Sequence, residues 1–212
     1  MRDTIDARRL RENKRSALIF AGGRASRLGG VNKALLEVGG STIVARILAA
    51  LGPLVDEHVV LTNDTALVQL EDVRLVFDPT PHAGVLPALA AGLEAAAGDI
   101  CLAVACDMPF VSSELFTHLL ELQRLEDADV VIPRTAGFLE PMHAVYRREP
   151  VLQAIQAALG RGDQRMISYF ADVRVREVHE DEWRMADPSG KAFFNVNTPE
   201  DQDEARRIAA RG

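Results

Sequence analysis

A glycine-rich segment near the start of the sequence carries the residue types that bind phosphate. Residues 22–33 contain four glycines and three cations, and they follow directly on the apolar run Ser16 to Phe20. Glycines let a backbone approach a triphosphate and aim successive amides at it, while Arg27 and Lys33 can neutralise charge on phosphate oxygens. Taken alone, the glycines are equally consistent with a tight surface turn that carries solvated basic residues.

The spacing within this segment disfavours two common nucleotide motifs. The glycines fit neither the GxxxxGK[ST] pattern of P-loop proteins nor the GxGxxG pattern of dinucleotide-binding proteins. The segment therefore predicts a phosphate site of another kind.

Two later positions offer oxygen atoms that could hold a metal ion. Asp107 follows the apolar run Ile100 to Val104, and Asn197 stands just before a predicted helix start at Thr198. Magnesium prefers oxygen ligands and usually keeps several waters, so one or two carboxylates plus a substrate phosphate suffice. On the residues alone, Asp107 could instead cap the next helix, and Asn197 could cap the last helix together with Thr198.

Apolar runs that predict strands alternate with helical patterns along the chain. Because the runs are apolar throughout, rather than at every second residue, both faces of their sheet should be covered. We therefore predict an α/β fold of three layers, a Rossmann-like arrangement in which a mostly parallel central sheet carries helices on both faces. Ligands bind such a sheet at the carboxyl ends of its strands, where the glycine segment and Asp107 fall. The predicted strands are Ser16–Phe20, His58–Leu61, Val73–Phe77, Ile100–Val104 and Val130–Ile132, and the predicted helices are Thr42–Leu51, Leu86–Ala97, Ser112–Gln123 and one that begins after Thr198.

The domain organisation follows from the same pattern. We expect residues 1–15 to form a polar leader and residues 16–212 to form one domain. The N-terminal half should bind the nucleotide. Beyond Pro133 the pattern is less regular, and the charge-rich stretch from Gly160 to Lys191 is expected in the half that binds the acceptor.

Composition narrows the classes of function. The net charge of −7 argues against a broad nucleic-acid surface, and no apolar run approaches the roughly 20 residues that span a bilayer. We therefore expect no nucleic-acid partner and no membrane partner. The first fifteen residues lack the apolar core of a secretory signal, and the two cysteines, Cys101 and Cys106, form no paired framework, so the predicted location is the cytoplasm. The five histidines are scattered and show no triad or metal spacing.

The segment FAGGRASRLGGVNKALL resembles the LAGGxSxRMGxDKxLL signature of the nucleotidyltransferase family typified by molybdenum cofactor guanylyltransferase. The resemblance covers about residues 16 to 210. Asn32 replaces the acid that precedes the lysine of the motif, and the GPLAG motif of the family is matched only loosely by Gly84–Ala88. Further segments that carry the resemblance are Asp78, Gly84–Leu93, Ala105–Pro109, Leu139–Met142 and Phe194–Asp201.

By this resemblance, Arg27, Lys33 and Asp107 are the catalytic residues, and Mg²⁺ is the cofactor. Asp107 would hold the metal, and Asn197 could complete the metal site. The acceptor would be bound by Arg165, in the glycine-flanked basic loop Gly160–Arg165, and by Pro141. That loop could equally be a solvated connection.

The nucleoside would lie near the start of the glycine segment. Relatives that use GTP tend to have LAGG at this point, and those that use CTP have LAAG, so Gly23 favours guanine. Asn63 and Asp78 would contact the base or the ribose, although as isolated residues they would more often form turns. The predicted nucleotide-binding residues are Ala21, Gly22, Gly23, Lys33, Asn63, Asp78 and Asp107.

The leading hypothesis is transfer of GMP from GTP to the phosphate of molybdopterin, which forms the guanine dinucleotide cofactor and releases pyrophosphate. A second hypothesis keeps the fold but takes CTP as donor or a sugar or polyol phosphate as acceptor. A third is a non-catalytic nucleotide-binding accessory protein, suggested by Asn32. The expected partners are GTP and molybdopterin or another phosphorylated small molecule, with molybdoenzymes or their chaperones as further candidates.

Overall fold

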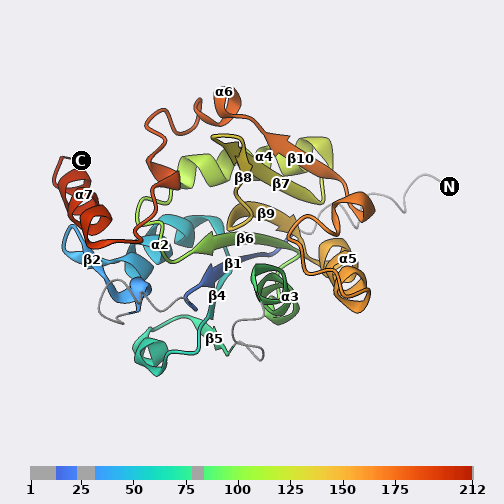
Figure 1. The fold of residues 1–212 in the computed structure, drawn as a ribbon, viewed down its shortest axis with the longest axis horizontal. Coiled ribbons are helices and arrows are strands. Elements are labelled where there is room, and N and C mark those ends of the chain that lie inside the picture. Colours follow the sequence, from blue (N-terminus) through green and yellow to red (C-terminus); the bar gives the residue numbers. More distant parts are fainter. Residues whose placement is uncertain (1–12, 23–31, 78–83, 212) are drawn as a thin grey trace.

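The computed structural model describes residues 13–22, 32–77 and 84–211. Within them, eight strands form one sheet in the order β10-β7-β9-β6-β1-β4-β5, and β8 pairs with β7 at one end (Figure 1). The strands of this sheet are β1 (Arg15–Phe20), β4 (Glu57–Leu61), β5 (Arg74–Val76), β6 (Ile100–Ala105), β7 (Val130–Thr135), β8 (Phe138–Leu139), β9 (His143–Arg147) and β10 (Val175–Val178).

Six α-helices and several 3-10 turns connect or follow these strands in the described chain. A short hairpin of β2 (Glu37–Val38) and β3 (Ser41–Thr42) stands apart from the main sheet. The helices are α2 (Ile43–Leu51), α3 (Val85–Ala95), α4 (Ser113–Glu126), α5 (Arg148–Gly160), α6 (Glu180–Trp183) and α7 (Pro199–Ala209), and the 3-10 turns are η2 (Lys33–Leu35), η3 (Gly52–Leu54), η4 (Thr65–Gln69), η5 (Phe170–Asp172) and η6 (Lys191–Phe193). None of the described helices is long and apolar enough to cross a membrane.

The sheet is mostly parallel, as predicted, with one antiparallel strand inside it. β1 pairs in parallel with β4 and β6, β4 with β5, and β7 with β10. β9 lies antiparallel between β6 and β7. The carboxyl ends of β1, β4 and β6 therefore meet at one edge of the sheet, which is the edge where an α/β fold binds ligands.

Helices cover both faces of the sheet and make three layers, which confirms the predicted fold class. Figure 1 shows α3 and α5 in front of the sheet, with α2 and α4 on the far side. In β1, Leu18 packs on the α3 and α5 side, whereas Ala17 and Ile19 pack on the α2 and α4 side, and all three are fully buried. Burial on both faces explains why the strands are apolar throughout.

Polar caps begin the helices where the sequence predicts them. The Ser112 hydroxyl accepts a hydrogen bond from the Leu115 N–H and caps α4. Thr198 and Asp201 form a reciprocal capping box at the start of α7, with a proline in the first turn. The first of these helices follows Asp107 and the second follows Asn197.

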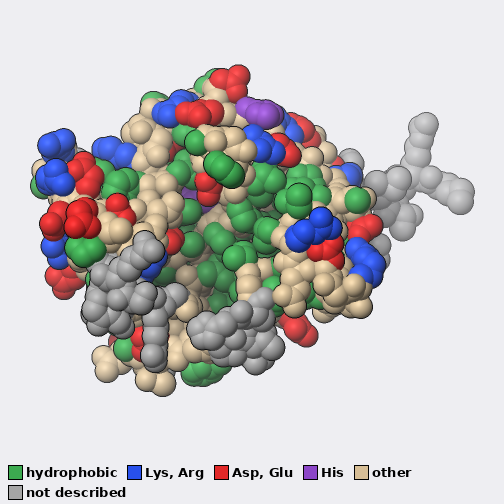
Figure 2. All heavy atoms as spheres, in the orientation of Figure 1, with side chains coloured by type: hydrophobic (Ala, Val, Ile, Leu, Met, Phe, Trp, Pro, Cys, Tyr) green, Lys and Arg blue, Asp and Glu red, His purple; other side chains and the backbone are tan. Residues whose placement is uncertain are grey.

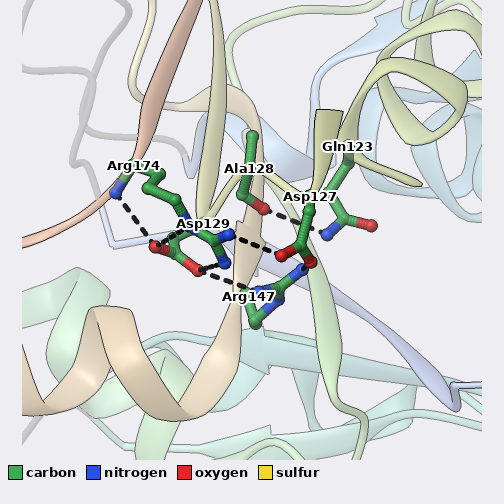
Figure 3. Close-up of polar contacts among 6 residues, drawn as sticks. All are labelled: Gln123, Asp127, Ala128, Asp129, Arg147 and Arg174. Atoms are coloured by element: carbon green, nitrogen blue, oxygen red, sulfur yellow. Dashed lines mark hydrogen bonds and ion pairs between the residues drawn. The ribbon is translucent and has the colours of Figure 1, made fainter. Parts of the chain in front are cut away.

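A network of charged side chains links β7, β9 and β10 at the end of the sheet that lies opposite the carboxyl ends of β1, β4 and β6 (Figure 3). Asp129 accepts hydrogen bonds from the Arg174 backbone at 2.9 Å and from Arg147 Nη1 at 3.0 Å. Asp127 ends α4 in the left-handed conformation and accepts from Arg147 and Arg174, each at 2.5 Å. Two carboxylates are thus matched by two guanidinium groups.

The arginines of this network keep its carboxyl groups ionised. Burial alone would raise the pKa of Asp129, but hydrogen bonds and charge from Arg174 and Arg147 outweigh burial and lower it. Hydrogen bonds from the same two arginines lower the pKa of Asp127. The network therefore contributes to the fold while both carboxyl groups carry charge.

Candidate active site

Three predicted site residues from distant parts of the chain meet at the carboxyl edge of the sheet. Lys33 opens η2, Asp107 follows β6, and Asn197 precedes α7. The Lys33 ammonium lies 3.3 Å from Asp107 Oδ2 and donates a hydrogen bond to Asn197 Oδ1 at 2.5 Å. One cation thus already lies between the two oxygen-bearing side chains that were predicted to hold a metal.

Backbone hydrogen bonds fix the loop that carries Asp107. The Cys106 N–H donates to the Phe20 carbonyl at 3.0 Å, which ties the loop to the end of β1. The Val196 N–H donates to the Asp107 carbonyl at 2.8 Å, which ties it to the segment before α7. Asp107 is therefore held from both sides, and it does not depend on its own side chain for its position.

Asp201 orients Asn197. Its Oδ2 atom accepts hydrogen bonds from the backbone N–H groups of Asn197 and Thr198, both at 2.9 Å. The hydrogen bond from Asn197 is the main reason that the pKa of Asp201 is lowered, and the charge of Lys33 lowers it further. Asp201 is not among the site residues that the sequence predicts, so its part in placing Asn197 is a finding of the structure.

The carboxylate of Asp107 retains an unused oxygen. Its Oδ1 atom is buried and has no hydrogen-bond partner among the described residues. A buried carboxylate oxygen without a partner is costly unless a cation or a donor reaches it. This atom therefore fits a metal ligand, and the Asn197 amide oxygen, which contacts the same Lys33 ammonium, provides a second oxygen.

The donor set suits magnesium better than a transition metal. In the part of the chain that the structure describes, no three His, Cys, Asp or Glu side chains form a cluster that could hold a metal ion by themselves. A metal beside Asp107 would take at most a carboxylate and an amide oxygen from the described residues, and water or substrate phosphate would complete its shell. That is the usual manner in which proteins hold Mg²⁺.

A hollow of about 80 Å³ opens at these residues, and its lining includes Ala21, Asn32, Lys33, Cys106 and Asp107. It is far smaller than the roughly 300 Å³ or more of a typical small-molecule site, so it suits a phosphate group or a hydrated ion. The rest of a nucleotide would lie beyond it.

A larger hollow of about 570 Å³ lies between α2, the start of α4 and residues 187–191. Its wall balances Arg46 and Lys191 against Glu114 and Asp187. We place the chemistry in the smaller hollow, because that one holds the Lys33–Asp107 pair and lies at the carboxyl ends of the parallel strands.

The predicted nucleoside residues fall at the ends of β1 and β4. Ala21 is buried, and its N–H donates to the Leu61 carbonyl at 2.8 Å. Gly22 is exposed, and a Cβ atom there would meet nothing within 4 Å in the described chain. Asn63 is exposed just after β4. Among these three residues, Gly22 and Asn63 have surface that a base could reach.

Three predicted site residues lie outside the described residues. These are Gly23, Arg27 and Asp78. Their assigned roles stay predictions.

The two predicted acceptor residues do not join the Lys33 group. Arg165 is 78% exposed and pairs with Asp163 through Nε at 3.0 Å and Nη2 at 2.6 Å. These contacts lower the pKa of Asp163 to about 2. Pro141 is half-buried, and its carbonyl accepts from the Tyr146 hydroxyl at 2.7 Å. In the described structure, neither residue forms a hydrogen bond or an ion pair with Lys33, Asp107 or Asn197.

His143, which contacts the residue after Asp107, is unsuited to acid–base chemistry. His143 is fully buried between the rings of Phe116 and Phe193, and its Nδ1 lies 3.2 Å from the Met108 sulfur. Burial lowers the pKa of His143 to about 3, so its ring is neutral at physiological pH. Its place in the core agrees with the sequence, in which no histidine has the spacing of a catalytic pair.

Comparison with known proteins identifies the chain's relatives. The MobA-like NTP transferase domain family matches residues 17–177. A protein of Methanosarcina acetivorans, named probable molybdenum cofactor guanylyltransferase, is 36% identical over 90% of this chain and 89% of its own length. A protein of the same name from Pelotomaculum thermopropionicum is also 36% identical, over 92% of this chain and 93% of its own.

Solved structures share the fold. Molybdopterin-guanine dinucleotide biosynthesis protein A from Archaeoglobus fulgidus superposes with a TM-score of 0.78 at 23% identity, covering 93% of this chain and 100% of the other. The 2-C-methyl-D-erythritol 4-phosphate cytidylyltransferase from Thermus thermophilus superposes with a TM-score of 0.68 at 22% identity, covering 93% and 99%. Because proteins named for both kinds of nucleotide share this architecture, the fold alone does not choose the base.

Proposed function

Because the chain belongs to the MobA-like NTP transferase family, and is therefore a nucleotidyltransferase, we propose that it transfers GMP from GTP to the phosphate of molybdopterin. The products are the guanine dinucleotide form of the cofactor and pyrophosphate. The observation that carries the proposal is the convergence of Lys33, Asp107 and Asn197 at the carboxyl edge of the sheet, in a chain whose relatives are named for this reaction.

The reaction needs no general base from the protein. A phosphate monoester has a second pKa near ~6, so the acceptor is already an oxyanion at neutral pH. One of its oxygens attacks the α-phosphorus of GTP, and the bond from that phosphorus to the bridging oxygen breaks as pyrophosphate leaves. The neutral, enclosed His143 is consistent with such a mechanism, since no proton has to be removed from the nucleophile.

Charge neutralisation is what the described residues supply. Lys33 would contact the phosphate oxygens and stabilise the charge that builds up as pyrophosphate leaves. We propose the same role for Arg27, which lies outside the described residues. Asp107 and Asn197 would hold Mg²⁺, which when bound neutralises phosphate charge. Holding donor and acceptor in line supplies the rest of the catalysis.

The position of Lys33 supports a shared role for these three side chains. Its ammonium lies where two oxygens converge, 3.3 Å from one and 2.5 Å from the other. Two oxygens that share an ammonium can also share a metal cation. With the metal on Asp107 and Asn197, Lys33 would be free to turn toward the triphosphate.

The remaining assignments are part of the proposal. Gly22, Gly23 and Asn63 would face the guanine or the ribose together with Asp78, and the Ala21 backbone would support them. Arg165 and Pro141 would bind the acceptor, for which Arg165 would have to exchange Asp163 for the acceptor phosphate. We also propose the cytoplasm as the location, which cell fractionation tests.

The surface agrees with a small-molecule substrate. Figure 2 shows apolar side chains in the centre of one face, with acidic and basic side chains interspersed around its rim. Among the described residues of that face, no broad basic area is visible of the kind that would follow a nucleic-acid backbone.

Pyrophosphate release from each of the four common NTPs, with and without molybdopterin, tests the proposal. We expect release that requires Mg²⁺, GTP and molybdopterin together. Release with CTP and a polyol phosphate would establish the alternative transferase, and equal binding of all four NTPs without release would favour an accessory role.

A Gly23→Ala variant in the same assay should narrow the preference for GTP over CTP, because the added methyl would crowd the larger base.

A further inference from the structure

Asn32 lies at the junction of three segments that the proposed nucleotide site needs. Its Oδ1 atom accepts from the Ala34 N–H at 2.9 Å and so caps η2, the turn that carries Lys33. Its Nδ2 atom donates to the Ala21 carbonyl at 3.4 Å and to Asp64 Oδ2 at 3.1 Å. The side chain thus joins the Lys33 turn to the start of the glycine segment and to the turn after β4.

These contacts require both ends of an amide. A carboxylate could still accept from Ala34, but it has no proton to donate to Ala21 or Asp64. An aspartate at position 32 would also place two carboxylates where the amide and Asp64 now lie 3.1 Å apart. Asn32 is 7% exposed, so water cannot readily replace the lost contacts.

Asp64 supplies the negative charge that the motif would place at position 32. It is half-buried, and its Oδ1 atom accepts from the Ala66 N–H at 2.9 Å and caps η4. Its Oδ2 atom faces Asn32. The contact between Asn32 and Asp64 therefore contains both a carboxylate and a hydrogen bond, and the carboxylate belongs to the turn after β4.

We propose that Asn32 and Asp64 form a positioning pair, which holds the start of the glycine segment and the turn after β4 in the geometry that binds the nucleotide. In this pair, Asp64 carries the charge that the motif places at position 32, and the Asn32 amide links that carboxylate to the Lys33 turn. The kinetic part of this inference rests on the proposed function, and the structural part does not.

A double-mutant cycle tests the pair. Asn32→Asp keeps the cap on Ala34, but it removes the donor and places a second carboxylate beside Asp64, so it should raise the KM for GTP about tenfold while kcat falls by a smaller factor. Adding Asp64→Asn swaps donor and acceptor across the contact and should recover most of the lost affinity. Adding Asp72→Asn, which removes the same charge from an exposed aspartate on the same β4–β5 connection, should recover none.

Urea unfolding of these three variants, of Asp64→Asn alone and of the wild type, without nucleotide, gives an independent reading. The Asn32→Asp and Asp64→Asn changes should each lower the urea midpoint. In the double variant, the midpoint should fall by less than the sum of the two single decreases. If the wild type releases no pyrophosphate but the unfolding midpoints of the variants show this coupling, the proposed function is refuted and the Asn32–Asp64 pair is supported. Additive midpoints, or a rescue by Asp72→Asn equal to that by Asp64→Asn, would refute the pair.

Discussion

At the scale of single residues, the site depends on very few side chains. Lys33 is the described cation that contacts both Asp107 and Asn197, and the proposed reaction has no general base to share the work. Substitution of one of these residues should therefore harm turnover far more than folding.

Lys33→Ala should reduce the rate of pyrophosphate release by about 10² to 10³, the usual cost of removing one stabilising charge from a transition state. The loss should fall on kcat. Lys191→Ala serves as the matched control, since Lys191 is exposed and lies outside the proposed site. Equal losses in the two variants would show that Lys33 does not act on the phosphates.

Asp107→Asn should abolish transfer at ordinary Mg²⁺ concentrations and recover part of it when Mg²⁺ is raised. The substitution keeps the size of the side chain but removes the charge beside the unpartnered Oδ1 atom. Titration of activity against Mg²⁺ measures the change, and Asp181→Asn on α6 controls for the loss of one charge. An unchanged Mg²⁺ requirement in Asp107→Asn would remove Asp107 from the metal site.

At the scale of secondary structure elements, the start of α7 serves both stability and the site. Asp201→Ala should cost about 1 kcal/mol of unfolding free energy, because it removes one half of a capping box. It should also raise the Mg²⁺ concentration needed for half-maximal activity, since Asn197 loses the hydrogen bond that orients it. Glu200→Ala, in the same helical turn, should affect stability less and leave the Mg²⁺ requirement as it is.

The turn between α3 and β6 fits no side chain at Gly98. A Cβ atom at Gly98 would lie 2.5 Å from Ser16 Oγ and 2.8 Å from the Arg15 backbone. Gly98→Ala should therefore lower the free energy of unfolding by about 1 to 3 kcal/mol, as forced overpacking does.

Gly160→Ala, at the end of α5, is the control for this prediction. An added Cβ there meets nothing within 4 Å among the described residues, and alanine favours a helix. Urea unfolding of both variants makes the comparison. A Gly98→Ala protein as stable as Gly160→Ala would contradict the packing argument.

The sequence predicts strands and helices better before Pro133, where they alternate regularly, than in the less regular part of the chain after it. The runs at Ser16–Phe20 and Ile100–Val104 correspond to β1 and β6, and Asp107 falls at the strand end where it was expected. β9 could not be predicted, because a short, fully buried run carries no sign of strand direction. The hydrogen bond between Asn32 and Asp64 joins residues 32 positions apart, and only the packed sheet brings them together.

At the scale of the whole molecule, the Asp127, Asp129, Arg147 and Arg174 network should make stability depend on pH. Both carboxyl groups have a pKa lowered in the folded protein, so their contribution is complete above the unfolded value near 3.8 and is lost as the pH falls below about 4 through the folded value. Urea midpoints between pH 7 and pH 2 should show this loss.

Arg174→Gln is the variant that isolates the network. It removes one of the two cations and should lower the midpoint at pH 7 and flatten its decline below about pH 4. Arg206→Gln, on exposed α7, should keep the decline of the wild type. A variant at Arg174 with the same steep decline would assign the acid sensitivity to other carboxyl groups.

The contact between Lys33 and Asn197 spans 164 positions of the chain, and this sets the order in which the molecule acquires its chemistry. As the chain leaves the ribosome, the glycine segment and Asp107 emerge long before Asn197. A nascent chain can therefore pair β1 with β4 and β6 while the proposed metal site still lacks the amide oxygen. Under the proposed function, transfer would become possible only after Asn197 has been synthesised and has folded against Lys33.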